Sequence, residues 1–208
     1  METTPRDVLV VTDVQNDFCP GGSLPVPDGD AVIPLIHRIA SRFQHIVLTQ
    51  DWHPAGHVSF ASAHPGAKPN DVVATPGGQQ RLWPDHCIQG THGAELHLAL
   101  HLPQAELILR KGYRPERDAY SLFFENDHVT ASGFAAYCRE RGLERLFFAG
   151  LAYDYCVGFS ALDARRCGFA ATVIRDACRA IDVNGSVAAT EAGFTRSNVA
   201  IIDTPSLA

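Results

Sequence analysis

The chain has 208 residues, of which 46% are hydrophobic, and this length is sufficient for one domain with a sizeable buried core. Its formal charge of -6 comes without a long run of basic residues, which argues against nucleic acid as a partner. There is no signal-peptide pattern and no stretch of 18 uninterrupted apolar residues, so we expect a single domain over 1–208 with no membrane partner.

Six short apolar runs predict β-strands, at 8–12, 45–49, 105–109, 145–149, 170–174 and 199–202. Nearly continuous runs of this kind suit strands that are covered on both faces, as in a parallel sheet. Helical spacing recurs between the runs, at 31–42, 132–141, 154–167 and 186–195. The alternation predicts an α/β fold of three layers, α/β/α, with a central, mostly parallel sheet of about six strands.

Two helix boundaries carry recognisable signals, and one long stretch carries none. Gly142 suits the left-handed residue that ends a helix, and Asp154 can cap the next helix by accepting its free backbone N–H groups. Residues 50–93 hold five histidines among Pro, Gly and Asn, with little periodicity. Loops of this length in a compact domain are usually functional.

The six cysteines are scattered, with no CxxC pair. In a chain of this length the pattern indicates reduced thiols and therefore a cytoplasmic protein. The oligomeric state stays open between a monomer and a homo-oligomer.

Chemically capable side chains follow the predicted strands. Open parallel sheets bind ligands beyond the carboxyl ends of their strands, where the sequence places Asp13, Asp51, His53, Lys111 and Cys156. The start of a helix stabilises a thiolate, which makes Cys156 a candidate nucleophile with Lys111 close by. Taken singly, a buried apolar cysteine, a solvated lysine and a helix-capping aspartate remain alternatives.

Asp51 and His53 are two residues apart, so in an extended segment both side chains point the same way and can address one ion. His86 could complete an Asp-His-His set that suits a divalent metal, with zinc, manganese and iron all compatible. His57 and Ser59 are close enough in sequence to contact the same ion. Solvated or backbone-bonded histidines remain the alternative.

Four aromatic residues flank these groups in sequence, and their rings could enclose a flat aromatic ligand. They are Phe18, Trp83, Tyr113 and Tyr155. Ordinary core packing is the alternative for each of them.

Five segments together resemble the nicotinamidases (pyrazinamidases) of the isochorismatase-like hydrolases. They read VTDVQNDFCPGGSLPV, TQDWHPAGHVSF, WPDHCIQGTHGAEL, RKGYRPERDAYS and AGLAYDYCVGFSALDA, and they occur in the family's order nearly from end to end. The resemblance implies an amidase that hydrolyses nicotinamide to nicotinate and ammonia in NAD salvage and also accepts pyrazinamide.

The resemblance also implies roles for individual residues. Cys156 would attack the carboxamide and form a thioester, Asp13 would relay protons, and Lys111 would support the ionised pair. The backbone N–H groups of Ala152 and Cys156 would form the oxyanion hole, with a cis peptide bond between Leu151 and Ala152.

The metal and ring-binding roles come from the same resemblance. One divalent ion, with zinc as first candidate ahead of iron or manganese, would bind to Asp51, His53 and His86 and hold the pyridine nitrogen. Phe18, Trp83 and Tyr155 would form the ring pocket, and Asp17 would support hydrogen bonding in the site.

Two positions depart from the family pattern. Tyr153 stands where the family often has Thr, and Leu122 stands where Gly commonly follows the Tyr-Ser pair. We expect both to reshape the pocket, which keeps open a related cysteine hydrolase that acts on another amide or carbamoyl compound. A non-catalytic binding module is the other alternative, and the intact Asp13, Lys111 and Cys156 argue against it.

Overall fold

A computed structural model describes residues 1–75 and 77–207. Their main sheet has the strand order β5-β2-β1-β6-β7-β8, and every neighbouring pair is parallel. The strands are β1 (Asp7–Thr12), β2 (His45–Asp51), β5 (Leu107–Lys111), β6 (Arg145–Leu151), β7 (Ala170–Arg179) and β8 (Ala200–Ile202). The predicted α/β class with a parallel six-stranded sheet is confirmed.

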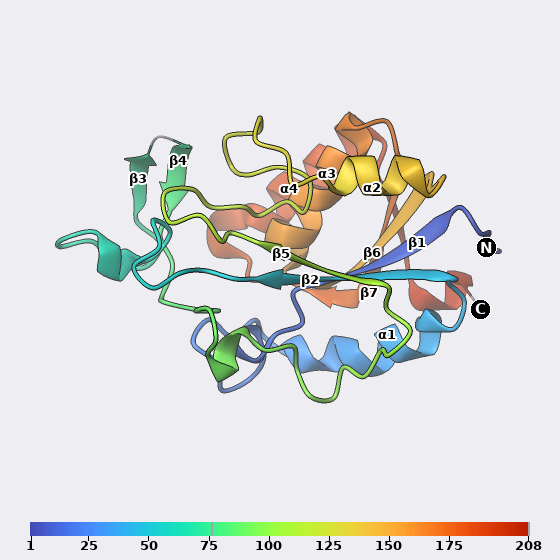
Figure 1. Cartoon of the computed structure of the whole chain (residues 1–208), viewed down its shortest axis with the longest axis horizontal. Helices are drawn as coiled ribbons and strands as arrows, with labels where there is room; N and C mark the ends of the chain where they lie inside the picture. Colours follow the sequence, from blue (N-terminus) through green and yellow to red (C-terminus); the bar gives the residue numbers. More distant parts are fainter. Residues whose placement is uncertain (76, 208) are drawn as a thin grey trace.

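Helices cover both faces of this sheet (Figure 1). α1 (Ile33–Ala40) lies on one face, and α2 (Phe134–Glu140), α3 (Gly158–Arg166) and α4 (Ser186–Ser197) lie on the other. Successive residues of β1 alternate between the two resulting cores: Leu9 joins the first cluster, and Val8 and Val10 join the second. Burial on both faces explains why the strands read as continuous apolar runs.

Strand boundaries differ from the sequence predictions mainly at the carboxyl ends. β2 continues to Asp51 and β5 continues to Lys111, and these two end residues are paired across the sheet. Backbone pairing does not depend on side-chain polarity, so the strands run on past their apolar residues. Asp51 and Lys111, which the sequence analysis placed after these two strands, are therefore the last residues of the strands.

Helix boundaries show one confirmed prediction and one wrong prediction. Gly142 is left-handed, with φ +67°, and follows Arg141, the residue that caps the carboxyl end of α2. Asp154 does not cap its own helix, because a π-helical turn, Tyr153–Val157, precedes α3. Its carboxylate instead accepts hydrogen bonds from the backbone N–H groups of Ile181 (3.0 Å) and Asp182 (2.8 Å).

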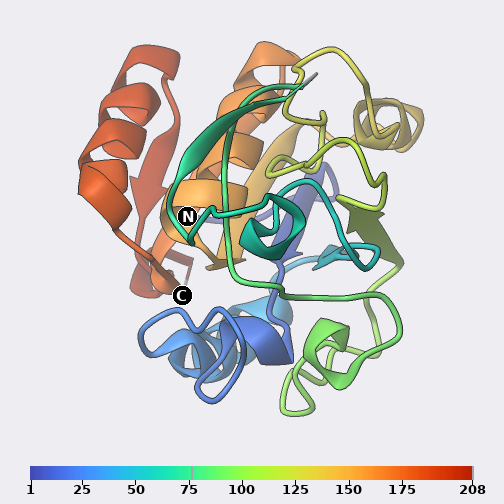
Figure 2. The same ribbon diagram turned by 90° about the vertical axis from the view of Figure 1, so that its left-hand side faces the viewer.

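The stretch 50–93 contains a two-stranded antiparallel hairpin that the sequence did not predict, β3 (Val72–Thr75) with β4 (Gly78–Arg81). Its strands have four residues each and are largely exposed, so they lack the apolar signal of the main sheet. Figures 1 and 2 show the hairpin beyond the carboxyl ends of the main strands. Among the described residues, none of the helices is long and apolar enough to cross a membrane.

Candidate active site

The strand order brings the predicted polar residues to one edge of the sheet. β5, β2, β1 and β6 are consecutive neighbours, and Lys111, Asp51 and Asp13 lie at or just beyond the ends of the first three. Cys156 lies in the π-helical turn that follows β6. All four side chains are buried, so the edge forms an enclosed polar site instead of a solvated rim.

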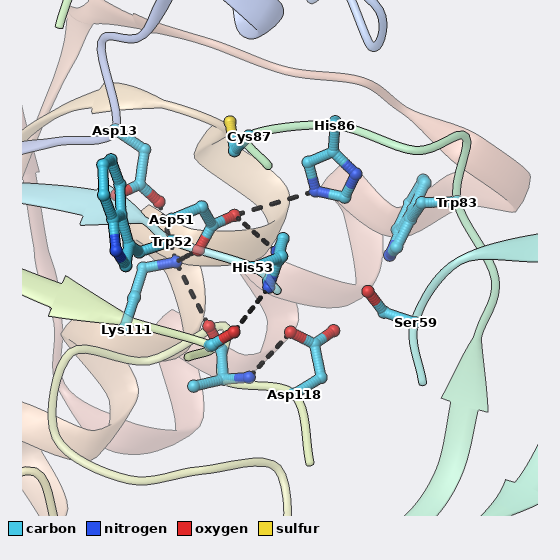
Figure 3. Close-up of polar contacts among 12 residues, drawn as sticks. Asp13, Asp51, Trp52, His53, Ser59, Trp83, His86, Cys87, Lys111 and Asp118 are labelled. Atoms are coloured by element: carbon cyan, nitrogen blue, oxygen red, sulfur yellow. Dashed lines mark hydrogen bonds and ion pairs between the residues drawn. The ribbon is translucent and has the colours of Figure 1, made fainter. Parts of the chain in front are cut away.

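Lys111 is the centre of this group (Figure 3). Its Nζ lies 2.8 Å from a carboxylate oxygen of Asp13 and 3.2 Å from Sγ of Cys156, and it also pairs with Asp51. The ammonium donates a further hydrogen bond to the backbone oxygen of Ala119 (3.1 Å). Burial opposes the charge on Lys111, but Asp13 and Asp51 outweigh burial and raise its pKa well above the ordinary value. Lys111 therefore stays protonated between two carboxylates and the sulfur.

Thr49 fixes the conformation of Asp13. Asp13 is left-handed, with φ +47°, and its backbone N–H donates to the Thr49 hydroxyl oxygen at 3.1 Å. The same hydroxyl donates to Oδ1 of Asp13. One buried side chain therefore holds both the backbone and the carboxylate of Asp13, a role that no motif in the sequence indicated.

The electrostatic setting of Cys156 differs from the sequence prediction. Burial raises the pKa of the Cys156 thiol well above its ordinary value, and Lys111 offsets only part of this effect. Burial also raises the pKa of Asp13, against the opposing effect of Lys111. The position near a helix start predicted a lowered thiol pKa, and the depth of burial in the structure works in the opposite direction.

Asp51, His53 and His86 form a compact group that could hold a metal ion. Oδ2 of Asp51 lies 3.6 Å from Nε2 of His53 and 3.9 Å from Nε2 of His86. The Nδ1 atoms of the two rings lie 2.7 Å and 2.8 Å from the backbone carbonyls of Gly112 and Pro84. A carbonyl can only accept a hydrogen bond, so each ring donates from Nδ1, and a neutral ring turns its Nε2 lone pair toward Asp51. Burial opposes a charge on His53, but Asp51 and, less strongly, Asp118 outweigh burial and raise the pKa of this ring.

The chemistry of these three donors fits a divalent ion. Burial, helped by repulsion from His53, lowers the pKa of His86 to about 4, so this ring is neutral at neutral pH. Burial alone would raise the pKa of Asp51, but Lys111 and His53 outweigh it and keep the carboxylate ionised. One carboxylate and two imidazoles are ligands that zinc, iron and manganese accept.

His57 and Ser59 pack next to His53, which belongs to the group of Asp51, His53 and His86. The ring of His57 stacks on His53, with 4.3 Å between ring centroids. Its Nδ1 bonds to the Ser59 hydroxyl (2.7 Å), and its Nε2 donates to the carbonyl of Arg117 (3.0 Å). Both ring nitrogens of His57 therefore have protein partners in the described structure.

A narrow cavity adjoins the polar residues. Phe18, Trp83 and Tyr155 line it, as predicted for a ring pocket, together with Ala152 and Cys156. Trp83 meets Tyr155 edge to face, with centroids 4.9 Å apart. The cavity is therefore walled by aromatic rings, with the cysteine and the metal-type ligands exposed inside it.

Three sequence expectations about the pocket are wrong. Tyr113 is half exposed and lies outside the cavity lining. Tyr153 packs against Phe194 in the second core, and Leu122 is fully buried in the same core, so neither reaches the cavity. The two departures from the family pattern therefore lie in the second core and outside the cavity lining.

The structure adds four lining residues that sequence reasoning missed. They are Leu24, Asp118, Tyr120 and Ile181. Asp17, expected to support hydrogen bonding, accepts the backbone N–H of Cys87 at 2.7 Å and so anchors the chain next to His86. The peptide bond between Leu151 and Ala152 is cis, as the resemblance implied.

Comparison with known proteins places this geometry in a family. Residues 7–205 match the isochorismatase domain. A nicotinamidase from Acinetobacter baylyi is 51% identical over 179 residues, which cover 86% of this chain and 84% of that protein. The chain belongs to the isochorismatase family. Its fold class was therefore predicted correctly from the sequence.

Solved structures extend the likeness of this isochorismatase-family chain. A nicotinamidase and pyrazinamidase from Acinetobacter baumanii has a TM-score of 0.97 and 46% identity, covering 99% of each chain. A pyrazinamidase from Pyrococcus horikoshii, solved in complex with zinc, has a TM-score of 0.76 and 34% identity, covering 96% of this chain and 99% of that one.

Proposed function

We propose that this protein is a nicotinamidase, which hydrolyses nicotinamide to nicotinate and ammonia for NAD salvage and also accepts pyrazinamide. The observation that carries the proposal is the position of Lys111, whose ammonium contacts Asp13, Asp51 and Cys156 beside a cavity walled by aromatic rings. The names of its relatives, nicotinamidase and pyrazinamidase, agree with this chemistry. The free cysteines suit a reducing, cytoplasmic setting.

In the first half-reaction Asp13 takes the thiol proton as the sulfur of Cys156 attacks the carboxamide carbon. Donor atoms of Asp13, Asp51 and Cys156 lie within 4.8 Å of one another, so this transfer needs no large movement. The carbon–nitrogen bond then breaks, Asp13 returns the proton to the leaving nitrogen, and ammonia departs from a thioester.

In the second half-reaction Asp13 removes a proton from water, and the resulting hydroxide attacks the thioester carbon. The carbon–sulfur bond breaks, the sulfur regains a proton, and nicotinate leaves. Lys111 stabilises the negative charge that moves between sulfur and carboxylate. We assign the oxyanion formed in each half-reaction to the backbone N–H groups of Ala152 and Cys156, which line the cavity.

We assign the metal-ligand role to Asp51, His53 and His86, with zinc as the first candidate and iron or manganese as alternatives. A divalent ion bound there supplies a Lewis-acid contact that orients the pyridine ring. Phe18, Trp83 and Tyr155 pack against the ring and exclude water from its faces.

Release of ammonia from nicotinamide tests the proposal. We expect Cys156→Ala to abolish release, whereas Cys138→Ala, the same change at a buried cysteine outside the cavity, retains it. Mass spectrometry of acid-quenched wild-type enzyme should find a nicotinoyl group on the peptide that contains Cys156. Full turnover by Cys156→Ala would rule the mechanism out.

Substrate comparison tests the activity itself. Turnover of nicotinamide and pyrazinamide should greatly exceed that of an aliphatic amide or a carbamoyl compound, because the aromatic walls recognise a flat ring. A preference for the aliphatic or carbamoyl compound would favour the alternative cysteine hydrolase.

A further inference from the structure

Asp118 is a buried acid in the cavity that the proposed mechanism does not use. It is 4% exposed and lies in the segment between β5 and α2. Its carboxylate points toward His53 from the side away from Asp51 (Figure 3). Donor atoms of Asp118, His53 and His57 lie within 4.8 Å of one another. Asp118 therefore faces the candidate metal ligands from a second direction.

The orientation of Asp118 is fixed, and among the described residues its carboxylate forms no ion pair. One carboxylate oxygen accepts the backbone N–H of Ala119 (2.8 Å), and the other accepts the side-chain amide of Gln80 (2.9 Å). Within residues 1–75 and 77–207, no Lys, Arg or His nitrogen lies within 4.0 Å of it. A buried carboxylate is costly without a positive charge nearby, and once the His53 ring is neutral, as metal ligation requires, the described residues supply no cation in contact with Asp118.

The formal charges around the cavity point the same way when both imidazoles are neutral, as metal ligation requires. Asp13, Asp51 and Asp118 then bring three negative charges, and Lys111 brings one positive charge. The remaining two negative charges equal the charge of one divalent cation. This balance requires Asp118, because the other three side chains alone leave a single negative charge.

A second metal site made of His53, His57 and Asp118 does not fit the hydrogen bonds. Nδ1 of His53 is used by the carbonyl of Gly112, and both ring nitrogens of His57 are used. Each oxygen of Asp118, by contrast, keeps a lone pair after its one hydrogen bond.

We propose that Asp118 is a positioning residue for the divalent ion at Asp51, His53 and His86. It provides the second balancing charge, and its free lone pairs accept hydrogen bonds from water or amide groups in the ion's remaining coordination positions. The proposal rests on the metal-ligand role assigned above. Gln80, on the β3–β4 hairpin, holds the carboxylate in its orientation and so links the hairpin to the metal site.

Titration of chelator-stripped protein with Co²⁺, followed by visible absorption without substrate, tests this inference. We expect Asp118→Asn to weaken Co²⁺ binding by about 10- to 100-fold, the range found for partners that orient metal ligands. Asp85→Asn is the matched control, because it removes the same charge beside His86 from an exposed position. It should stay within about twofold of wild type, since solvent screens exposed charges. Thermal melting of both variants establishes that they fold.

Gln80→Met provides a second test, because it keeps the charge of Asp118 and removes the hydrogen bond that Asp118 accepts from Gln80, together with the side-chain bonds of Gln80 to Tyr120 and Asn126. Its Co²⁺ affinity should fall between those of wild type and Asp118→Asn. If Asp118→Asn folds and binds Co²⁺ as tightly as wild type, the proposal is overturned. If Asp118→Asn does not fold, wild-type Co²⁺ affinity in Gln80→Met overturns it. Because no substrate is present, these results are independent of whether Cys156 hydrolyses nicotinamide.

Discussion

The contact between Thr49 and Asp13 allows a sharp prediction about catalysis. Thr49→Val keeps the shape of the side chain and removes the hydroxyl that bonds both the backbone N–H and the carboxylate of Asp13. A buried hydrogen bond to a charged group contributes about 1.5–3 kcal/mol. If that energy is lost from the transition state, kcat falls by roughly 10- to 150-fold, at 1.36 kcal/mol for each factor of ten.

The effect of Thr49→Val should be confined to the chemical step and should leave substrate binding nearly unchanged. Thr49 does not line the cavity, so KM for nicotinamide should change less than about threefold. Steady-state ammonia release measures kcat and KM, and peptide mass spectrometry after brief alkylation measures the reactivity of Cys156, which should fall in parallel. The free energy of unfolding should drop by about 1–3 kcal/mol, because the N–H of Asp13 is left without a partner.

Thr49→Ser is the control for this prediction, since it retains the hydroxyl and loses only a methyl group. Its kcat should stay within about threefold of wild type. Wild-type kcat in Thr49→Val, or an equal loss in Thr49→Val and Thr49→Ser, would refute the reasoning that the hydroxyl positions Asp13.

Other parts of the site give further predictions. Lys111→Met leaves two buried carboxylates without their cation and should lower the unfolding free energy by about 3–5 kcal/mol in urea titrations; a change below about 1 kcal/mol would contradict the ion-pair description. Gly112→Ala places a Cβ 2.4 Å from the ring of His53, at a residue whose φ is +63°. The ring must move, so the affinity for Co²⁺ should fall by more than about tenfold. Unchanged affinity would show that the ring has room to accommodate the Cβ. Removal of metal by a chelator, checked by elemental analysis, should raise KM for nicotinamide and be reversed by added zinc; equally tight binding by metal-free protein would exclude the orienting role.

The strand ends were the predictable part of the fold and of the site. Apolar runs locate parallel strands, and parallel strands end at a shared edge, so the positions of Asp13, Asp51 and Lys111 near one another followed from the sequence. The structure brings Cys156 to the same group. Their catalytic and metal-binding roles stay predictions until they are measured.

The remaining parts depend on packing between distant segments. Tyr120 and Asp118 lie in an irregular segment without periodicity, and their positions depend on Gln80 of an unpredicted hairpin. The pKa of Cys156 depends on how deeply the sulfur is buried, which local sequence does not reveal. Tyr153 was expected to reshape the pocket because it departs from the family pattern, whereas its ring turns toward Phe194 in the second core.

The site is divided between the ends of the central strands and one long connection, and this division affects how the substrate preference of such a protein can change. The proposed nucleophile, Cys156, and the proposed proton carrier, Asp13, lie just beyond the ends of the central strands, whereas His53, Trp83 and His86 belong to the connection over 52–106 between β2 and β5. Changes in the sequence of that connection can alter which substrate is bound without altering the strands of the sheet. Asp51 limits such changes, because its partner Lys111 also contacts the sulfur of Cys156.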